Sequence, residues 1–492
     1  MAPAKSHNLD HCGRNRCCFG KAGYDKDGYI DEKENLKVDL KQDCRLILDD
    51  PKNGKVIFQR KFATCDIRDY AVDIGTTQFL FATGPSTKHR NLKDRNVFYD
   101  FRYNQLLQYP VSLPKIDPEA RTMEIRAIDA HVPNVETTYW CAIVQLDRSL
   151  QEQKHHIIKM EPLITPGNEH LVHHMEVFHC VYDTDASTEY NGDCNSERKP
   201  KMTHMCSKVI AAWAMGAGPV IYPKEAGLPF GGPGFRPLVM VEIHYNNPEL
   251  ASGIVDNSGF RFTFTPNLRK NDAAIIELGL IYSDANSIPP GQTAFPMTGY
   301  CTSECTQKFP KKGIHIFGTQ LHSHLTGRKL WTSHYRNGIK IGEINRDNHF
   351  SSHWQHIVNL HKHVHVLPGD GGYEIENEMC VNYIYYYPAS DVEVCKSAVD
   401  NSTLHKWFKS KGIQNSNLLI HQKYQKLEKY WNTQLTTELL ELYTTGSLNL
   451  ACLDHGGDLF KGQKWEQISQ PETFAGTFDK TRSNLECPSL ND

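Results

Sequence analysis

The sequence predicts a mainly β protein built from antiparallel β-sandwiches or jelly rolls. Short segments rich in β-branched and aromatic residues, such as PLVMVEIHY, GFRFTFT and MCVNYIYYYP, recur along most of the 492 residues. Clusters of Gly, Pro, Asp and Asn separate these segments, as tight turns require. Segments with helical spacing of apolar residues are few. We therefore expect packed sheets with little helix.

The pattern of strands and turns divides the chain into five parts. Residues 1–40 are polar and rich in cysteine, and we expect them to form a tail. A small group of strands follows over 41–117, and the segment PVSLPKIDPEA then leads to two larger groups of strands, 121–268 and 269–420. The last part, 421–492, carries an amphipathic helix. Its apolar residues at helical spacing are Leu427, Trp431, Leu435, Leu439 and Leu442.

Charge and hydropathy exclude two classes of partner. The formal net charge is −3, and Lys and Arg are spread along the chain without a basic stripe, so we expect no nucleic-acid partner. No stretch reaches the ~18 apolar residues that span a bilayer, because Gly216, Gly218 and Pro219 interrupt the most apolar segment. We therefore expect no transmembrane segment.

The cysteine content indicates an oxidising compartment. Fifteen cysteines are too many to remain thiols in a reducing cell compartment, and they do not form the paired CxxC motifs of zinc modules. We expect a disulfide-bonded protein of the secretory pathway, secreted or kept in a vesicle lumen, and the NST sequon at Asn401 predicts glycosylation. The first residues, MAPAKSHNLDHCGRNRCCFG, lack the apolar core of a signal peptide, which a truncated or alternative start would explain.

Five histidines occur in patterns that suit metal binding. His322 and His324 are two residues apart in a predicted strand, so both side chains lie on one face and can bind one ion. The adjacent His173 and His174 can bind together only at a bulge or a strand end. His244 ends the predicted strand VMVEIHY at a sheet rim. Because the chain has 25 histidines, some of these patterns also arise by chance.

A methionine makes copper the expected metal. A thioether is a poor ligand for zinc but a good one for Cu(I), whereas imidazole binds copper in both oxidation states. Met379 lies in the segment NEMCVNY. Alone it could equally be a buried core residue beside Cys380. Together with the five histidines it predicts two copper sites and redox chemistry.

Six motifs, found in order along the chain, carry a resemblance to a known family. They are HHMEVFHC, EIHYNNP, GYCTSECTQ, GIHIFGTQLHSHLTGRKL, EMCVNYIYYYP and CKSAVD. In these motifs the chain resembles the copper type II, ascorbate-dependent monooxygenases, within the branch of the dopamine β- and tyramine β-monooxygenases. The similarity covers roughly residues 40 to 490.

The resemblance implies two copper ions per chain in uncoupled sites. The ligands of the copper that stores and passes an electron would be His173, His174 and His244. The ligands of the copper that binds dioxygen would be His322, His324 and Met379. Ascorbate would donate the electrons. The substrate would be a small arylamine such as tyramine or dopamine, whose benzylic carbon receives one atom of O2 while the other leaves as water.

The resemblance also implies roles for residues around the two sites. Tyr139 would be catalytic, although it could equally be a packed strand aromatic, and His322 would be the ligand nearest the chemistry. The peptide-amidating branch has an Arg at the position of Gln320, which holds a carboxylate, so a neutral amide here favours an amine substrate. Glu242, on the same strand face as His244, and Tyr383 are candidates for binding the substrate.

The family's architecture gives further expectations. The segment 41–117 would be part of a DOMON-like β-domain, 121–268 and 269–420 would be the two copper-binding sandwiches, and the chain would form a homo-oligomer. The disulfide framework of the family would pair Cys65 with Cys487, Cys141 with Cys194, Cys180 with Cys206, Cys301 with Cys395, and Cys305 with Cys452.

The chain departs from the family after Asp370, where it runs directly into GGYEIENEMC. The family has a further strand and turn there, carrying the cysteine that pairs with the one corresponding to Cys380. We expect its loss to bare core and to leave Met379 poorly held. A catalytically impaired isoform, or a monooxygenase-like protein with an unknown substrate, is therefore the alternative to an active enzyme.

Overall fold

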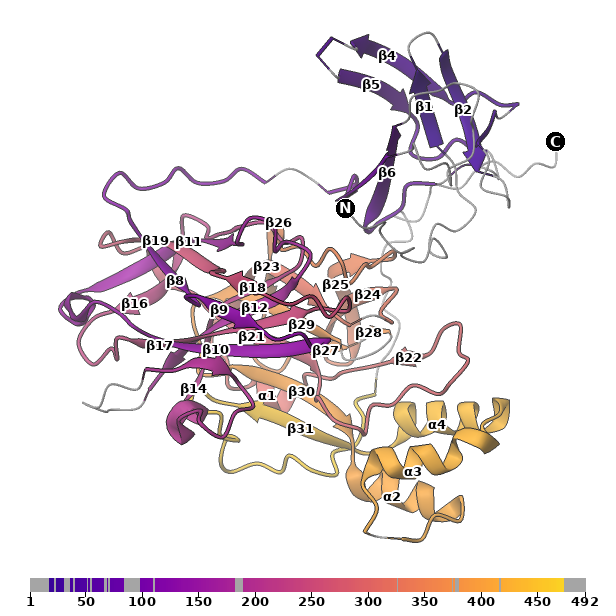
Figure 1. Cartoon of the computed structure of the whole chain (residues 1–492). Helices are drawn as coiled ribbons and strands as arrows, with labels where there is room; N and C mark the ends of the chain where they lie inside the picture. The colour runs from indigo at the N-terminus through magenta and orange to yellow at the C-terminus, as the bar shows by residue number, and fades with distance from the viewer. Residues whose placement is uncertain are drawn as a thin grey trace. The chain divides into compact units, whose positions relative to one another are not determined.

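The structure, a computed structural model, describes residues 17–472 with short gaps, the longest of which are 84–97 and 182–188. It divides into two compact units, residues 1–108 with 479–492, and residues 109–478. The prediction of a mainly β protein is confirmed, since sheets dominate both units (Figure 1). Over the described part of the chain, no helix combines the length and apolar character needed to cross a membrane.

The described residues of the N-terminal unit form three small antiparallel sheets. Where we expected a tail, residues 17–38 carry a three-stranded sheet. Two hairpins follow, and in the first of them Val56, Ile57 and Phe58 are exposed. The strands are β1 (Cys17–Lys21), β2 (Tyr24–Ile30), β3 (Leu36–Val38), β4 (Cys44–Asp50), β5 (Lys55–Arg60), β6 (Thr77–Thr83) and β7 (Phe98–Asn104).

The first sandwich of the larger unit packs a five-stranded sheet, in the order β13-β10-β17-β12-β14, and a six-stranded sheet around a common core. Five strands of the second sheet follow the order β20-β16-β11-β19-β8, and the sixth, β15, also pairs with β11. The strands of the first sheet are β10 (Thr137–Gln145), β12 (Val172–Cys180), β13 (Asn191–Asp193), β14 (Cys206–Ala214) and β17 (Leu238–Asn246). The strands of the second are β8 (Arg121–Arg126), β11 (Lys154–Leu163), β16 (Ala226–Gly231), β19 (Gly259–Thr265) and β20 (Asn271–Asp272). Short strands at its margins are β9 (Ala130–Val132), β15 (Val220–Ile221) and β18 (Ile254–Asp256).

The second sandwich is built on a six-stranded sheet in the order β26-β23-β29-β21-β30-β31, with smaller sheets β25-β24-β27 and β22-β28. The strands of the large sheet are β21 (Ala274–Leu280), β23 (Ile314–His322), β26 (Val358–Val366), β29 (Val381–Tyr387), β30 (Val394–Val399) and β31 (Leu448–Leu453). The strands of the smaller sheets are β22 (Pro296–Met297), β24 (Leu330–Arg336), β25 (Ile339–Asp347), β27 (Gly371–Tyr373) and β28 (Ile375–Glu376).

Three of the four α-helices in the described residues, α2, α3 and α4, lie together in the C-terminal part beside β30 and β31 (Figure 1). The single helix expected over Leu427–Leu442 is in fact interrupted, because Asn432 has an extended backbone and its side chain accepts a hydrogen bond from Leu435 N, which starts a new helix. The helices are α1 (Ser303–Thr306), α2 (Asn401–Ser410), α3 (Ile420–Leu427) and α4 (Thr433–Thr445).

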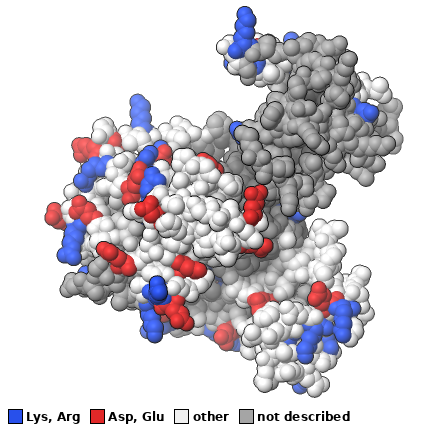
Figure 2. All heavy atoms as spheres, viewed as in Figure 1, with Lys and Arg blue, Asp and Glu red and all other residues white. Residues whose placement is uncertain are grey.

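One hydrophobic core spans both sandwiches. Phe317 of β23 and Tyr385 of β29 belong to the same buried cluster as Tyr222 and Ile157 of the first sandwich. The rings of Tyr222 and Phe317 lie 5.5 Å apart, centroid to centroid. At the surface, basic and acidic side chains are interspersed over the part of this face that is not drawn in grey in Figure 2.

Four of the five expected disulfides are confirmed, namely Cys141–Cys194, Cys180–Cys206, Cys301–Cys395 and Cys305–Cys452. Cys44 and Cys65 are disulfide-bonded as well, while Cys487, the expected partner of Cys65, lies outside the described residues. Cys395 and Cys452 are directly opposite on β30 and β31. The two disulfides from these strands therefore fix α1 to the sheet.

Removing the Cys305–Cys452 disulfide should destabilise the protein strongly. This bond joins residues 147 apart in sequence, and in the chain-entropy model a loop of that length stabilises the fold by about 5 kcal/mol. The Cys180–Cys206 bond spans only 26 residues and should contribute about 3.5 kcal/mol by the same model. Urea denaturation of the two double-serine variants would measure both values. Equal losses would contradict the loop-length explanation.

Candidate metal centre

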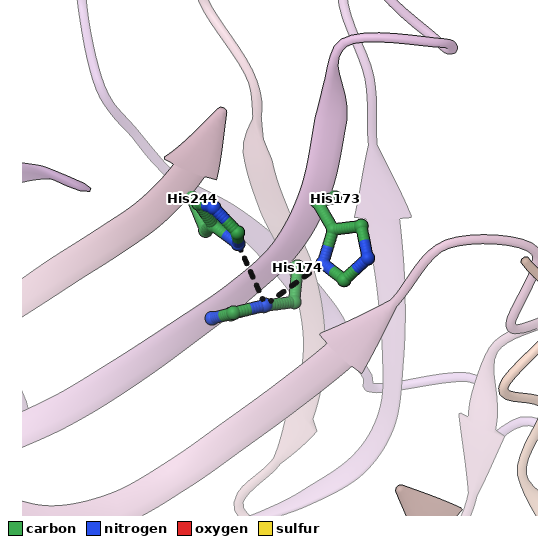
Figure 3. A group of neighbouring side chains, drawn as sticks. All are labelled: His173, His174 and His244. Atoms are coloured by element: carbon green, nitrogen blue, oxygen red, sulfur yellow. Dashed lines mark hydrogen bonds between the residues drawn. The ribbon is translucent and has the colours of Figure 1, made fainter. Parts of the chain in front are cut away.

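Two neighbouring strands of the first sandwich bring three histidines together. His174 on β12 is directly opposite His244 on β17, and the register shifts between Val172 and His174. His173 is the extra residue at this irregularity, which is the bulge that joint binding by adjacent histidines requires. The bulge turns His173 toward the same side as its neighbours (Figure 3).

The three imidazoles are close enough to share one ion. His174 Nδ1 lies 3.2 Å from His173 Nδ1 and 3.3 Å from His244 Nδ1 (Figure 3). One nitrogen from each ring lies within 4.8 Å of the other two. His244 Nε2 is buried and has no hydrogen-bond partner among the described residues. A buried nitrogen left in this state is costly unless a ligand engages it.

The rings of this group are neutral at pH 7. Burial, with the neighbouring histidines, lowers the pKa of His173 and that of His244 to about 4. Burial likewise holds the pKa of His174 well below its ordinary value. A neutral imidazole has a lone pair available, so the group is prepared to bind a metal without first losing protons.

Tyr139 packs directly on this group. It is opposite His244 in the pairing of β10 and β17, and the two rings stack with centroids 4.5 Å apart. Burial, and then the carboxylates of Glu242 and Glu176, raise the pKa of Tyr139, so its phenol keeps its proton. The ring is thus placed to orient His244.

A second pair of histidines lies where β23 ends. His322 is buried, and its Nδ1 lies 2.6 Å from Gln355 Oε1. Because the amide oxygen can only accept, this contact fixes the proton on Nδ1 and leaves the Nε2 lone pair for a metal. Burial lowers the pKa of His322 to about 3. The ring of His324 lies 5.4 Å from that of His322 at an angle of 89°.

The remaining expected ligand, Met379, lies outside the described residues. The chain beside it is tightly packed. Cys380 is fully buried and packs with Leu321, Leu330 and Phe350, which are buried as well. The missing strand was expected to expose the core, but these four residues are not exposed. The Cys380 thiol contacts Ser323 Oγ at 3.8 Å. Two residues after Met379, the sheet pairs Val381 with His322.

The two groups of histidines adjoin each other. The ring centroids of His174, from the first sandwich, and His322, from the second, are 6.1 Å apart. His324 also contributes to the lowered pKa of His173 and of His244. The two groups of histidines therefore adjoin where the two sandwiches meet.

Comparison with known proteins gives this arrangement a family. The description "Copper type II ascorbate-dependent monooxygenase, N-terminal domain" matches residues 123–252, and the corresponding C-terminal domain matches 271–371 and 371–408. The chain belongs to this monooxygenase family. The two C-terminal matches meet at residue 371, the point where the sequence suggested a missing segment.

Full-length relatives agree with the family models. This monooxygenase is 46% identical to a tyramine beta-hydroxylase of Caenorhabditis briggsae, over 95% of the chain and 84% of the relative. It is 39% identical to the dopamine beta-hydroxylase of Bos taurus, over 91% and 78%. A human DBH-like monooxygenase protein 1 is 32% identical, over 77% and 65%. The chain is thus an enzyme of a family that depends on copper and ascorbate.

The histidine groups of this monooxygenase fit copper. Burial lowers the pKa of His173, His244 and His322, and such neutral imidazoles bind copper in both oxidation states. In the first group, the Nδ1 atoms of His173 and His244 both lie beside Nδ1 of His174, so one ion can contact all three rings. In the second group, the contact between His322 and Gln355 prepares the opposite ring nitrogen for a metal.

A buried acidic network lies behind the histidines, and sequence reasoning missed most of it. Glu176 on β12 is opposite Glu242 on β17, and it accepts a 3.2 Å hydrogen bond from the Tyr383 hydroxyl. Burial, with the nearby Glu277 and Glu242 carboxylates, raises the pKa of Glu176 to about 8. Lys396 forms an ion pair with Glu277. The only sequence signal was a glutamate two residues after His174 in an apolar strand.

Acid should destabilise the copper-free protein through its buried histidines. The folded-state pKa values of His173, His244 and His322 are about 4, 4 and 3, against ~6.5 when unfolded. Below pH 6.5 the unfolded chain therefore binds protons that the folded chain does not. Between pH 7 and 5 the free energy of unfolding should fall by roughly 2 kcal/mol for each histidine.

Urea denaturation of the metal-free protein at pH 7 and pH 5 would measure this loss. A His244→Phe variant should lose less stability on acidification than the wild type, because one of the three groups is gone. The same loss in both proteins would contradict the assignment.

Proposed function

We propose that the chain hydroxylates the benzylic carbon of a phenylethylamine, such as tyramine or dopamine, with O2 and with ascorbate as electron donor. One oxygen atom enters the C–H bond and the other leaves as water, which consumes two electrons and two protons. Two one-electron metal ions suit this stoichiometry. The single observation that carries the proposal is that His174 and His322 lie 6.1 Å apart at the junction of the two sandwiches.

The proposed ligands divide between the two sandwiches. His173, His174 and His244 would hold one copper, and His322, His324 and Met379 the other. Copper bound there would supply one-electron redox chemistry and, at the second site, a position for O2. The chain's own part is to hold the imidazoles neutral and oriented. Gln355 orients His322, and Tyr139 stacks on His244.

Gln320 supports an amine as the substrate. Its side chain is buried, and its Nε2 donates a 2.8 Å hydrogen bond to Gln355 O. Its Oε1 is buried without a partner among the described residues. A free amide oxygen next to His322 can accept an N–H from an amine, whereas it offers nothing to a carboxylate. The neutral amide offers no ion pair to a carboxylate, which favours an amine as the substrate.

Tyr383 and Glu242 remain the proposed substrate contacts, with different roles. The Tyr383 hydroxyl is engaged by Glu176, so its ring, 6.2 Å from that of His322, is the part that would contact an aromatic substrate. Glu242 lies beside Cys141, whose Sγ is 3.7 Å from Oε2, and burial raises the pKa of Glu242. The positive charge of a substrate ammonium group beside Glu242 would lower the pKa of this residue again and so favour its charged carboxylate.

The disulfides and the glycosylation sequon bear on the compartment in which the enzyme is found. The four disulfides described support a protein of the secretory pathway, in a vesicle lumen or secreted, because such bonds persist in oxidising compartments. Asn401, the proposed glycosylation site, is exposed at the first position of α2. We also propose that the chain forms a homo-oligomer.

Copper content and product analysis test the proposal together. The purified chain should bind two coppers and convert tyramine or dopamine to the β-hydroxylated amine with matching consumption of ascorbate and O2. Peptides ending in glycine should not react. One copper with no hydroxylated product would overturn the proposal and favour the impaired isoform, which the interruption of the family match at residue 371 supports.

A further inference from the structure

A second set of histidines lies on the edge strand of the second sandwich. β26 is the terminal strand of its six-stranded sheet, and its sequence VNLHKHVHV carries a histidine at every second position near its end. His363 and His365 are two of these. On the neighbouring strand β23, His315 is directly opposite His365. Opposite residues of antiparallel strands have their Cβ atoms ~4.5–5.5 Å apart on one face of the sheet.

Contacts between side chains place all three rings on this face. The rings of His315 and His365 stack in parallel, with centroids 4.6 Å apart. His315 is also opposite Tyr387 on β29, and the rings of these two residues stack at 5.3 Å. The hydroxyl of Tyr387 lies 2.9 Å from His363 Nδ1. Tyr387 therefore joins His363 to the other two histidines.

The hydrogen bonds of these rings leave nitrogen lone pairs available. His365 Nε2 donates a 2.8 Å hydrogen bond to Lys312 O, so its Nδ1 carries the lone pair. The Tyr387 hydroxyl, 2.9 Å from His363 Nδ1, can accept a hydrogen bond from this nitrogen, and the lone pair of His363 is then on Nε2. Histidines that bind metals are usually held in this way, by a carbonyl or another polar group on the second nitrogen. Burial lowers the pKa of His315 and that of His363, which keeps both rings neutral.

We propose that His315, His363 and His365 form a separate surface site for one divalent transition-metal ion. Imidazole ligands suit both copper and zinc, and Cu²⁺ should bind more tightly than Zn²⁺. The nitrogens of the three rings do not converge on one point in the structure, so an ion would bind only after the side chains of His315 and His365 turn out of their stacked arrangement. His315 precedes His322 by seven residues on β23, roughly 23 Å along the strand, so the ion is separate from the proposed copper centre.

Metal counting on the full chain tests this site. Wild-type protein and a His363→Gln/His365→Gln variant would be stripped with a chelator, dialysed against Cu²⁺ and analysed for bound copper and by electron paramagnetic resonance. We expect the wild type to bind one equivalent more than the variant and to show one additional Cu²⁺ signal. A His131→Gln variant, which replaces an exposed histidine on β9, is the matched control and should retain all copper.

Zn²⁺ supplies a second readout. It should raise the melting temperature of the wild type and of the His131→Gln protein by more than that of the double variant, which keeps only the histidine groups of the proposed copper centre. Equal copper content in wild type and double variant, with equal Zn²⁺ stabilisation, would overturn the proposal. Failure of the proposed monooxygenase sites would lower copper equally in all three proteins and would leave the difference of one equivalent intact. The two proposals can therefore fail separately.

Discussion

Replacing His174 with alanine should abolish hydroxylation and remove one copper per chain. His174 is central to the first group, because its Nδ1 lies 3.2 Å from His173 Nδ1 and 3.3 Å from His244 Nδ1. The two remaining imidazoles would leave an ion exposed to solvent on one side. Without the first copper, only one of the two electrons can be stored in the protein before the reaction. Copper analysis and product formation from tyramine would measure both effects.

The matched control is His170→Ala, since His170 is exposed on the turn only four residues earlier. This variant should keep both coppers and full activity. The copper of the second group should also persist in His174→Ala, because its ligands come from the other sandwich. Normal turnover by His174→Ala, or loss of both coppers, would contradict the division of ligands between two sites.

Replacing Gln355 with leucine should weaken copper binding at the second group by ~10–100-fold, as is usual when the partner of a metal-binding histidine is lost. The Gln355 side chain accepts from His322 Nδ1 at 2.6 Å and donates to the carbonyl oxygens of Ser323 and Ser352. Leucine has a similar size but can do neither. His322 would then be free to place its proton on Nε2, the nitrogen intended for the metal. Copper titration followed by absorption or X-ray spectroscopy would measure the loss.

A Gln355→Glu variant separates orientation of the ring from packing. Its carboxylate can still accept from His322 Nδ1, so copper affinity should largely recover, although the bonds to Ser323 O and Ser352 O are lost. Those lost bonds should cost about 1–3 kcal/mol of stability in both variants. If the leucine variant binds copper as tightly as the wild type, Gln355 does not position His322.

The first group of histidines was predictable from sequence because its pattern is local. Adjacent histidines cannot share a face in a regular strand, so the pair His173 and His174 required an irregularity, and the structure has a register shift at that position. The HxH pattern of His322 and His324 likewise follows from strand periodicity. The disulfides came from the family resemblance and not from spacing, because spacing alone allows many pairings.

Residues brought in from distant segments were not predictable in this way. Gln355 is 33 residues from His322 and lies outside any strand, so no periodicity connects them. The approach of His174 to His322 depends on how two sandwiches pack. The C-terminal helix was expected to be continuous because its leucines keep helical spacing across Asn432. The capping hydrogen bond to Leu435 N outweighed that pattern.

The hydrophobic cluster common to both sandwiches makes them one folding unit. Separate domains in a chain ordinarily move relative to each other unless a large apolar interface prevents it. Here Phe317 and Tyr385 are core residues of both halves. If residues 121–268 were expressed alone, the apolar surface that packs against Phe317 and Tyr385 would be exposed to solvent. The isolated half should then aggregate or remain partly unfolded. The separation of the two histidine groups is therefore set when the chain folds and does not await the arrival of a substrate.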